Sequence, residues 1–354
     1  MAKRLLLAAV AALGFTDLIP AVHAQTVAPA APAPSGPVAL HGAGATFPAP
    51  LYLKWIDVYT KMNPKVAIDY KVVGSGEGTQ RFLGNSVDFG ASDAALSDEQ
   101  ISQAKAGATL IPATSGIIVL AYNLPDVKGT LKLSREVYAD MFLGKIRHWN
   151  DPRIQELNPE LKLPKQTITL VARLDSSGTT FAMTNHLSAI SEAWRNQGSG
   201  VGKVIDWPGV TMTAPGNEGV AGRIKRSWGS IGYVEYGFAE RLGLPMAHLQ
   251  NKAGRFIKPS LQSGQAAIAA NVAQIPSNLR VFLPDPDGEE SYPIITFTWL
   301  LLHDRYADPQ KSAALKGFVN WALMDGQSYS VDLGYIPLPE NVATLARAAV
   351  DRIQ

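Results

Sequence analysis

The sequence predicts an α/β protein divided into two lobes, with a ligand held between them. Strand-like segments repeatedly lead into a loop rich in Gly, Ser or Thr and then into a helix-like segment. Two strongly apolar, strand-like runs lie far apart in the chain, at residues 117–122 and 293–302. They suit a chain that leaves one lobe and later returns to it. Ligands of α/β proteins prefer the crevice at the carboxyl ends of strands, so the loops define the candidate site.

The composition is that of a globular protein without a strong charge of either sign. The chain has 354 residues, of which 46% are hydrophobic and 18% are charged, and its net charge is +2. This length suffices for two domains. Because there is no basic tract and no global field, we expect no nucleic-acid partner. A site for an anion must therefore depend on local groups.

Residues 1–24 have the pattern of a cleaved secretory signal peptide. Lys3 and Arg4 form a short basic start, and residues 5–15 are an apolar run too short to span a bilayer. The chain also contains no cysteine that could carry a lipid anchor. We therefore expect a freely soluble, exported protein of the Gram-negative periplasm, without direct membrane insertion. Residues 25–38 are rich in Ala and Pro, which predicts an extended, solvated leader.

Two Gly-rich loops early in the chain each precede a helix-like segment. They occupy residues 41–48 and 74–78. The first loop has Phe47 where a dinucleotide-binding fingerprint requires its third glycine, and the second lacks the Gly-Lys ending of a Walker A loop. Thr46 is expected to cap the helix that follows the first loop. The unpaired N–H groups at such helix starts suit an oxyanion.

A third loop, residues 173–180, follows the strand-like residues 167–171 and precedes another helix-like segment. Its Ser, Gly and Thr residues let an oxyanion approach the partial positive charge of a helix N-terminus. Arg173 offers two-point contact with an oxyanion, and Asp175 can hold its guanidinium in place. Taken alone, the loop is explained equally well as an ordinary helix cap beside a surface ion pair. Three such loops favour one anion held by converging helix N-termini.

The remaining segments are interpreted as structural. Residues 90–94 resemble a nucleophile elbow, but Ala94 stands where Gly is required. Residues 216–220 form one more loop before a helix, which we interpret as structural. The six histidines have no zinc or haem spacing, so we expect no metal, cofactor or catalytic residue. Helix-like patterns cover residues 137–149, 312–324 and 340–353, the last with its apolar stripe at Val342, Leu345, Ala349, Val350 and Ile353.

Three segments carry a resemblance to a known family. They are GAGATFPAP at residues 42–50, DFGASD at residues 88–93, and R-x-D-x-SGT at residues 173–179. These segments resemble the signatures of the periplasmic phosphate-binding proteins, the substrate-binding components of ABC-type phosphate importers. The likeness runs from about residue 39 to near the C-terminus. It implies a type II periplasmic-binding-protein fold with two hinge-crossing segments, in which residues 39–115 and 298–354 form lobe I and residues 116–297 form lobe II.

The resemblance also implies which residues hold phosphate. Lobe I contributes Thr46, Phe47, Ser75 and Asp93, and lobe II contributes Arg173, Ser177, Gly178 and Thr179. Asp175 supports Arg173, which is the one full positive charge of this set. A carboxylate such as Asp93 suits only a ligand that carries a proton, as phosphate does at neutral pH and sulfate does not. We therefore expect selectivity to depend on Asp93.

The sequence thus predicts a monomeric, non-catalytic protein that closes two lobes around inorganic phosphate and delivers it to an inner-membrane ABC permease. One alternative is a binder of another tetrahedral oxyanion. A second is a phosphatase-like enzyme, although the sequence offers neither a metal cluster nor an activated nucleophile. A third is a surface protein that only keeps the fold.

Overall fold

An eight-stranded sheet runs through the part of the chain that the computed structural model describes, residues 36–354. The predicted signal peptide and the leader up to residue 35 lie outside the described residues. Residues 37–354 belong to one unit by their contacts. In spatial order the strands are β2 (Val66–Val72), β1 (Val38–Gly44), β3 (Phe89–Ser92), β11 (Ile295–Leu302), β4 (Thr109–Tyr122), β8 (Ser230–Glu235), β6 (Thr169–Arg173) and β7 (Thr211–Ala214).

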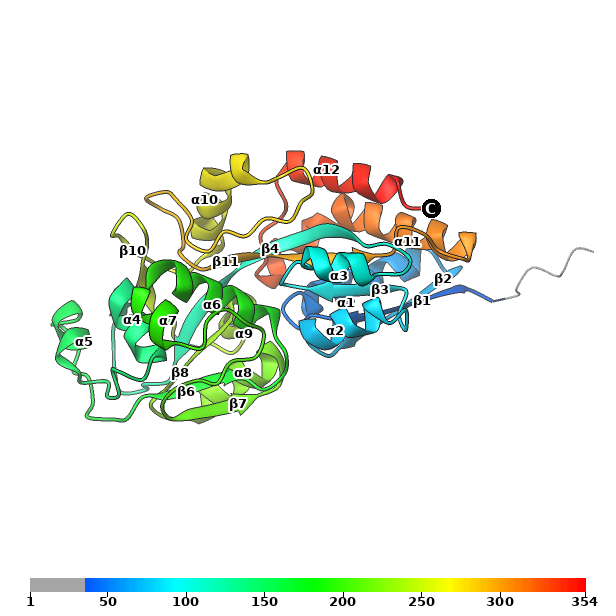
Figure 1. The fold of residues 1–354 in the computed structure, drawn as a ribbon. Coiled ribbons are helices and arrows are strands. Elements are labelled where there is room, and N and C mark those ends of the chain that lie inside the picture. Colours follow the sequence, from blue (N-terminus) through cyan, green and yellow to red (C-terminus); the bar gives the residue numbers. More distant parts are fainter. Residues whose placement is uncertain (1–35) are drawn as a thin grey trace, which may run out of the picture. The chain divides into compact units, whose positions relative to one another are not determined.

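Strand β4 belongs to both halves of this sheet. Its beginning pairs antiparallel with β11, and its end, from Ile118 to Tyr122, pairs antiparallel with β8. We call β2, β1, β3, β11 and the beginning of β4 the first half, and the end of β4 with β8, β6 and β7 the second half (Figure 1). Within each half, the strands that precede the candidate loops run parallel to their neighbours. The two predicted apolar runs lie in β4 and in and before β11, and both are buried.

Helices cover both halves of the sheet. The N-terminal and C-terminal helices lie beside the first half, and the helices coloured green in Figure 1 lie beside the second half. A small three-stranded sheet comprises β5 (Lys132–Leu133), β9 (His248–Gln250) and β10 (Phe256–Ile257). No helix among residues 36–354 is long and apolar enough to cross a membrane. The helices are α1 (Ala49–Met62), α2 (Ser75–Leu83), α3 (Asp98–Gln103), α4 (Arg135–Phe142), α5 (Pro152–Leu157), α6 (Gly178–Ile190), α7 (Glu192–Gln197), α8 (Gly216–Arg226), α9 (Tyr236–Arg241), α10 (Leu261–Asn271), α11 (Pro309–Leu323) and α12 (Glu340–Asp351).

The first Gly-rich segment forms a strand before it forms a loop, which the sequence pattern did not predict. A Cβ on Gly42 would lie 2.1 Å from the ring of Phe89, and a Cβ on Gly44 would lie 2.1 Å from the carbonyl oxygen of Ala91. Glycine is therefore required where β3 approaches β1 this closely. The same glycines remove the alternation of side chains by which a strand is recognised.

Two helix predictions need correction. The helix expected over residues 137–149 ends at Phe142, and the chain turns at Gly144, whose φ of 67° lies in the left-handed region. In α12 the predicted apolar stripe is right at Val342, Ala349 and Val350, but Leu345 is 44% exposed, and the buried Ile353 lies after the end of the helix. Ala346 is buried in place of Leu345 because it lies four residues after Val342 on the inner face.

Candidate functional site

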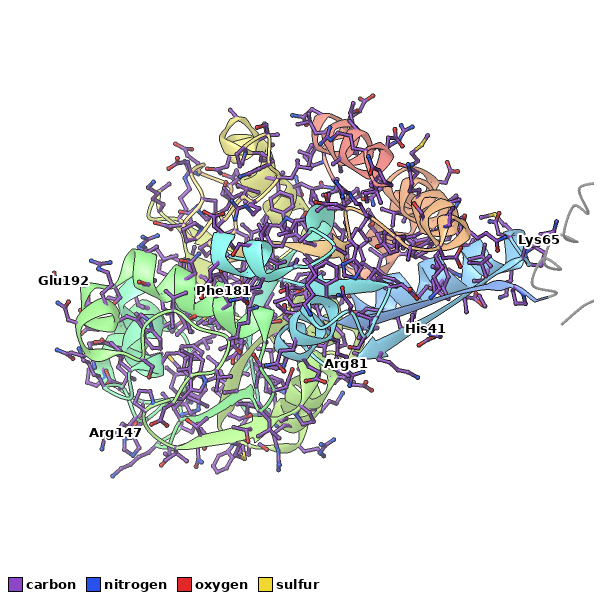
Figure 2. The ribbon with its side chains drawn as sticks, turned by 45° about the vertical axis from the view of Figure 1, so that its right-hand side comes forward. His41, Lys65, Arg81, Arg147, Phe181 and Glu192 are labelled. Atoms are coloured by element: carbon purple, nitrogen blue, oxygen red, sulfur yellow. The ribbon has the colours of Figure 1, made fainter. Side chains whose placement is uncertain are left out.

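The predicted site residues lie where strands of both halves of the sheet end. The loops after β1 and β2 and the end of β3 come from the first half, and the end of β6 with the loop after it comes from the second half. The eight predicted ligand residues are all buried. Charged side chains such as Arg147 and Glu192, by contrast, point away from the ribbon into solvent (Figure 2).

The two halves touch at Gly178, the first residue of α6. A Cβ on this glycine would lie 2.6 Å from Ser75 Oγ and 2.7 Å from Asp93 Cβ, both in the first half. Nearby, the Gly76 N–H donates to the carbonyl of Ser176 at 2.9 Å. The start of α2 therefore faces the start of α6, and Asp93 lies beside both.

Two of the helix starts carry the hydroxyl groups that the sequence indicates. Helix α2 begins at Ser75, directly after Gly74, whose φ is 97°. Helix α6 is capped by Ser177, whose Oγ accepts a hydrogen bond from the Thr180 N–H at 3.1 Å. The N–H groups at such starts carry partial positive charge and can donate to an anion.

The predicted cap of α1 is wrong. The helix begins at Ala49 with Pro48 in the capping position, and no side chain caps it. Thr46 Oγ1 instead accepts hydrogen bonds from Asn217, at 3.2 Å from its backbone N–H and at 3.0 Å from its side-chain amide. The hydroxyl of Thr46 therefore accepts hydrogen bonds that link the two halves of the sheet. Tyr335 donates its hydroxyl to the carbonyl of Phe47 at 2.6 Å, which fixes the turn after Thr46.

Asp175 holds the guanidinium of Arg173. Arg173 Nε donates to Asp175 Oδ1 at 2.8 Å, and its NH2 group bonds to Oδ2. The Gly216 N–H also donates to Asp175 Oδ1, at 2.9 Å. Burial alone would raise the pKa of Asp175, but Arg173 and the Gly216 N–H hold this pKa below its ordinary value. The third guanidinium nitrogen of Arg173 donates to Thr179 Oγ1 at 3.3 Å, so the cation is fixed on both sides.

Asp93 is a buried carboxyl group supported by hydroxyls. Thr298 donates to Oδ1 at 2.8 Å, and Ser75 donates to Oδ2 at 3.4 Å. Burial raises the pKa of Asp93 to about 6, although these hydroxyls and the charges of Arg173 and Lys203 oppose the rise. Thr298 belongs to β11, more than two hundred residues further along the chain, so nothing in the local pattern around Asp93 indicates it.

Asn217 is a central residue of the site that the sequence interpretation missed. The sequence pattern predicts a structural role for its segment, yet Asn217 is fully buried and bonded to proposed ligand residues. Its Nδ2 donates to Thr46 Oγ1 and, at 3.2 Å, to Thr179 Oγ1. Its Oδ1 accepts the N–H of Glu235 at 3.0 Å. The signal that could have identified it is the strand, glycine and helix pattern, which matches the other three loops.

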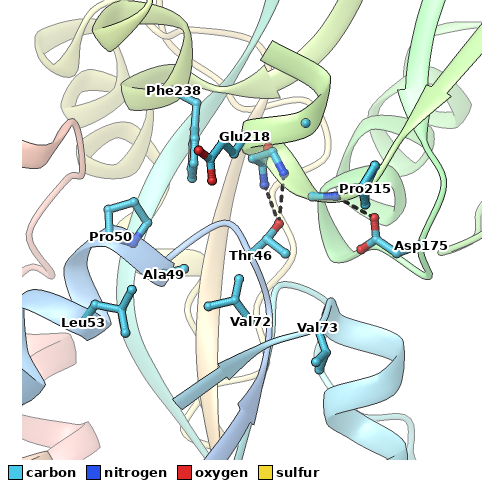
Figure 3. A pocket seen from close by; sticks show the side chains of 13 residues that line it. Thr46, Ala49, Pro50, Leu53, Val72, Val73, Asp175, Pro215, Glu218 and Phe238 are labelled. Atoms are coloured by element: carbon cyan, nitrogen blue, oxygen red, sulfur yellow. Dashed lines mark hydrogen bonds between the residues drawn. The ribbon is translucent and has the colours of Figure 1, made fainter. Parts of the chain in front are cut away.

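A cavity of about 560 Å³ opens beside this network. Figure 3 shows Thr46 pointing across it toward the start of α8, with Phe238 and Glu218 on the far side. Its walls are mostly apolar, since Ala49, Pro50, Leu53, Val72, Val73, Pro215 and Phe238 line it. Asp93 does not line it. The cavity is therefore an opening beside the polar network, lined by Asp175 and separate from the carboxyl group of Asp93.

The arrangement can hold one small oxyanion. Hydroxyls, helix N–H groups and one guanidinium lie together, and the Asp93 carboxyl group, with a pKa of about 6, can accept a hydrogen bond from a ligand that carries a proton. Among residues 36–354, no group of three or more His, Cys, Asp or Glu side chains is placed to hold a metal ion.

Comparison with known proteins gives consistent likenesses. A model of the PBP superfamily domain matches residues 31–325. A phosphate-binding protein PstS from Pasteurella multocida is 42% identical over 302 residues, which cover 85% of this chain and 86% of that protein. One from Haemophilus influenzae is 40% identical over 308 residues, covering 87% and 91%. A solved structure of a high-affinity periplasmic phosphate-binding protein, PfluDING, bound with phosphate is similar in fold, with a TM-score of 0.72 and 22% identity, over 88% of this chain and 93% of that one.

Proposed function

The chain belongs to the PBP superfamily and, within it, to the PstS phosphate-binding proteins, and from this premise we propose that it binds inorganic phosphate between two lobes. The main support for the proposal is that Asp93 and Arg173 are both buried and close enough to interact electrostatically. Arg173 and the helix starts attract an oxyanion, whereas Asp93 repels one unless the ligand carries a proton. Phosphate meets both conditions at neutral pH.

We propose that the eight predicted residues hold the phosphate oxygens. Thr46, Ser75, Ser177 and Thr179 donate from hydroxyl or N–H groups, and Phe47 and Gly178 donate from the backbone. Arg173 contributes the cation, with Asp175 holding it, and Asp93 accepts a hydrogen bond from the protonated oxygen of the ligand. Their burial and mutual contacts support this assignment.

The biological setting follows from the family. We propose that the protein is a periplasmic monomer without catalytic activity, exported by residues 1–24, which delivers phosphate to an ABC-type permease. Residues 39–115 and 298–354 would form lobe I and residues 116–297 lobe II, with hinge segments in β4 and β11. The pairing of β4 with strands of both halves supports this division.

Isothermal titration of the mature protein, residues 25–354, tests the proposal. We expect phosphate to bind with one site per chain and sulfate to give no heat. Arg173→Met should abolish binding, because it removes the cation and leaves Asp175 unpaired, whereas Arg147→Met at an exposed site should not. Heat with sulfate or molybdate but none with phosphate would overturn the proposal. Hydrolysis of a chromogenic phosphate ester by metal-free protein would contradict the absence of catalysis.

A further inference from the structure

The charges of the proposed ligand set do not suit a dianion. Arg173 is compensated by Asp175, which it contacts through two hydrogen bonds. Asp93 is 1% exposed and adds a negative charge to the same buried site when it is ionised. A phosphate dianion that enters would meet a local excess of negative charge in a poorly solvated place, which is costly. A second cation near Asp93 would remove this excess.

Lys203 lies in the loop between α7 and β7, which is fixed to the start of α6. Its carbonyl accepts the N–H of Ser177, the residue that caps α6, at 2.9 Å. The neighbouring Gly202 N–H donates to Thr184 Oγ1, in the second turn of α6, at 3.1 Å. The backbone of Lys203 is thus held against the helix start that we propose to bind phosphate.

The ammonium group of Lys203 is unpaired within residues 36–354, where it makes neither a hydrogen bond nor an ion pair. Arg280, which together with Lys203 lines a second cavity beside α3, differs in this respect. It forms an ion pair with Asp98 at 2.6 Å and donates to the carbonyl of Leu96 at 3.2 Å. Lys203 is therefore the cation in this cavity that remains available for a ligand.

Lys203 lines this cavity next to Asp93, although Asp93 itself is not part of the lining. The cavity measures about 760 Å³, and its lining includes Lys203, Phe181 and residues 94–100, which directly follow Asp93. Figure 2 shows Phe181 at the start of α6. Burial lowers the pKa of Lys203, and the charge of Asp93 opposes this change, so the two groups interact electrostatically. Glu99, the remaining charged residue of the lining, is exposed at the rim.

We propose that Lys203 is a second cation of the phosphate site, which rests on the proposed function above. It attracts the phosphate dianion through the cavity beside α3 and offsets the charge of Asp93 once the ligand is bound. A half-buried cation is less screened by salt than an exposed one, so one residue can affect both association and affinity. This role distinguishes Lys203 from Arg173, whose charge Asp175 already balances.

Stopped-flow tryptophan fluorescence and isothermal titration with inorganic phosphate, at low and high ionic strength, test this role. We expect Lys203→Met to slow association about 10-fold at low ionic strength, to weaken binding about 10-fold, and to flatten the salt dependence of the association rate. Lys203→Arg should retain most of the wild-type rate. Lys165→Met is the matched control, because Lys165 is exposed. It lies just before the start of β6, whereas Arg173 is at the end of this strand.

The outcomes separate the two proposals. If the wild type binds phosphate and Lys203→Met matches it in rate, affinity and salt dependence, the role of Lys203 is overturned while the proposed function stands. If Lys203→Met and Lys165→Met slow association equally, the effect comes from net charge and the proposal is wrong. If the wild type does not bind phosphate, the proposed function itself fails. Thermal unfolding without phosphate should give a cooperative transition for every variant, which shows that each variant is folded when its binding is measured.

Discussion

The side-chain amide of Asn217 donates a hydrogen bond to the hydroxyl of Thr46, with 3.0 Å between Nδ2 and Oγ1. Thr46 follows β1 in the first half of the sheet, and Asn217 lies in the first turn of α8, beside the second half. The same amide donates to Thr179 at 3.2 Å. Because both hydroxyl oxygens accept from Asn217, both hydroxyl hydrogens are free to donate to a ligand. Asn217 thus links the halves and orients two of the proposed ligand groups.

Replacement of Asn217 should weaken phosphate binding. Asn217→Ala removes the amide that orients Thr46 and Thr179, and we expect an affinity about 10-fold lower, measured by isothermal titration. It also leaves the buried N–H of Glu235 unpaired, which should lower the free energy of unfolding by about 1–3 kcal/mol. Asn196→Ala, at an exposed position of α7, is the control and should change neither quantity. An affinity of Asn217→Ala within twofold of the wild type would refute the orienting role.

A methyl group at Gly178 should block the approach of the two halves. In Gly178→Ala the new Cβ would lie 2.8 Å from the backbone nitrogen of Asp93 as well as against Ser75. Overpacking of this kind costs about 1–3 kcal/mol, so phosphate affinity should fall up to about 100-fold. Gly222→Ala in α8 is the control, because its nearest neighbour is the flexible end of Arg226 at 3.4 Å. Equal affinity of the two variants in isothermal titration would show that the contact at Gly178 has no part in binding.

Selectivity between phosphate and sulfate should change in Asp93→Asn. The amide no longer repels an unprotonated anion and offers an N–H donor in place of an acceptor. We expect this variant to bind sulfate measurably in isothermal titration, so that its affinities for phosphate and sulfate differ less than those of the wild type. The wild type should give no heat with sulfate. If sulfate still fails to bind Asp93→Asn, selectivity depends on another group, and the size of the site becomes the next explanation to test.

The general architecture could be predicted because it depends on local patterns. The apolar runs of β4 and β11 are buried as expected, and the loops at Ser75 and Ser177 begin helices as expected. The sequence does not predict strand β1, because its glycines allow the close approach of β3 and interrupt the alternation of apolar and polar side chains. Periodicity detects an amphipathic element and cannot detect a strand defined by its neighbours.

Only the site residues that belong to a recognisable sequence motif could be predicted. Thr298 donates a hydrogen bond to Asp93, and Lys203 interacts with it electrostatically. Both residues come from segments far away in the sequence, and no local spacing indicates either interaction. Asn217 had the same strand, glycine and helix pattern as the other loops, but Asn at a helix start is also a common structural choice. Its role depends on Thr46, more than one hundred and fifty residues away. Such contacts follow from topology, which one sequence does not reveal.

A buried glutamate next to β4 should make the stability of the protein depend on pH. Glu235 is fully buried, its Oε1 accepts the Gly237 N–H at 2.8 Å, and its Oε2 has no hydrogen-bond partner within residues 36–354. Burial raises its pKa from 4.5 to about 8, against the opposing effects of the Gly237 N–H and Arg241. A carboxyl group whose folded pKa is raised binds more protons in the folded state, so stability falls as pH rises from about 4.5 to about 8.

Glu235→Gln should remove this dependence. At about 1.4 kcal/mol per pH unit, the pKa shift of Glu235 corresponds to about 5 kcal/mol, so we expect the free energy of unfolding of the variant to rise by about 3–5 kcal/mol relative to the wild type between about pH 4.5 and about pH 8. Any cost of burying the amide is the same at every pH, so the test is the change of the stability difference with pH, measured by urea denaturation in phosphate-free buffer. Glu160→Gln, at an exposed position, should run parallel to the wild type. Parallel curves for Glu235→Gln as well would mean that Glu235 is not held protonated by its burial.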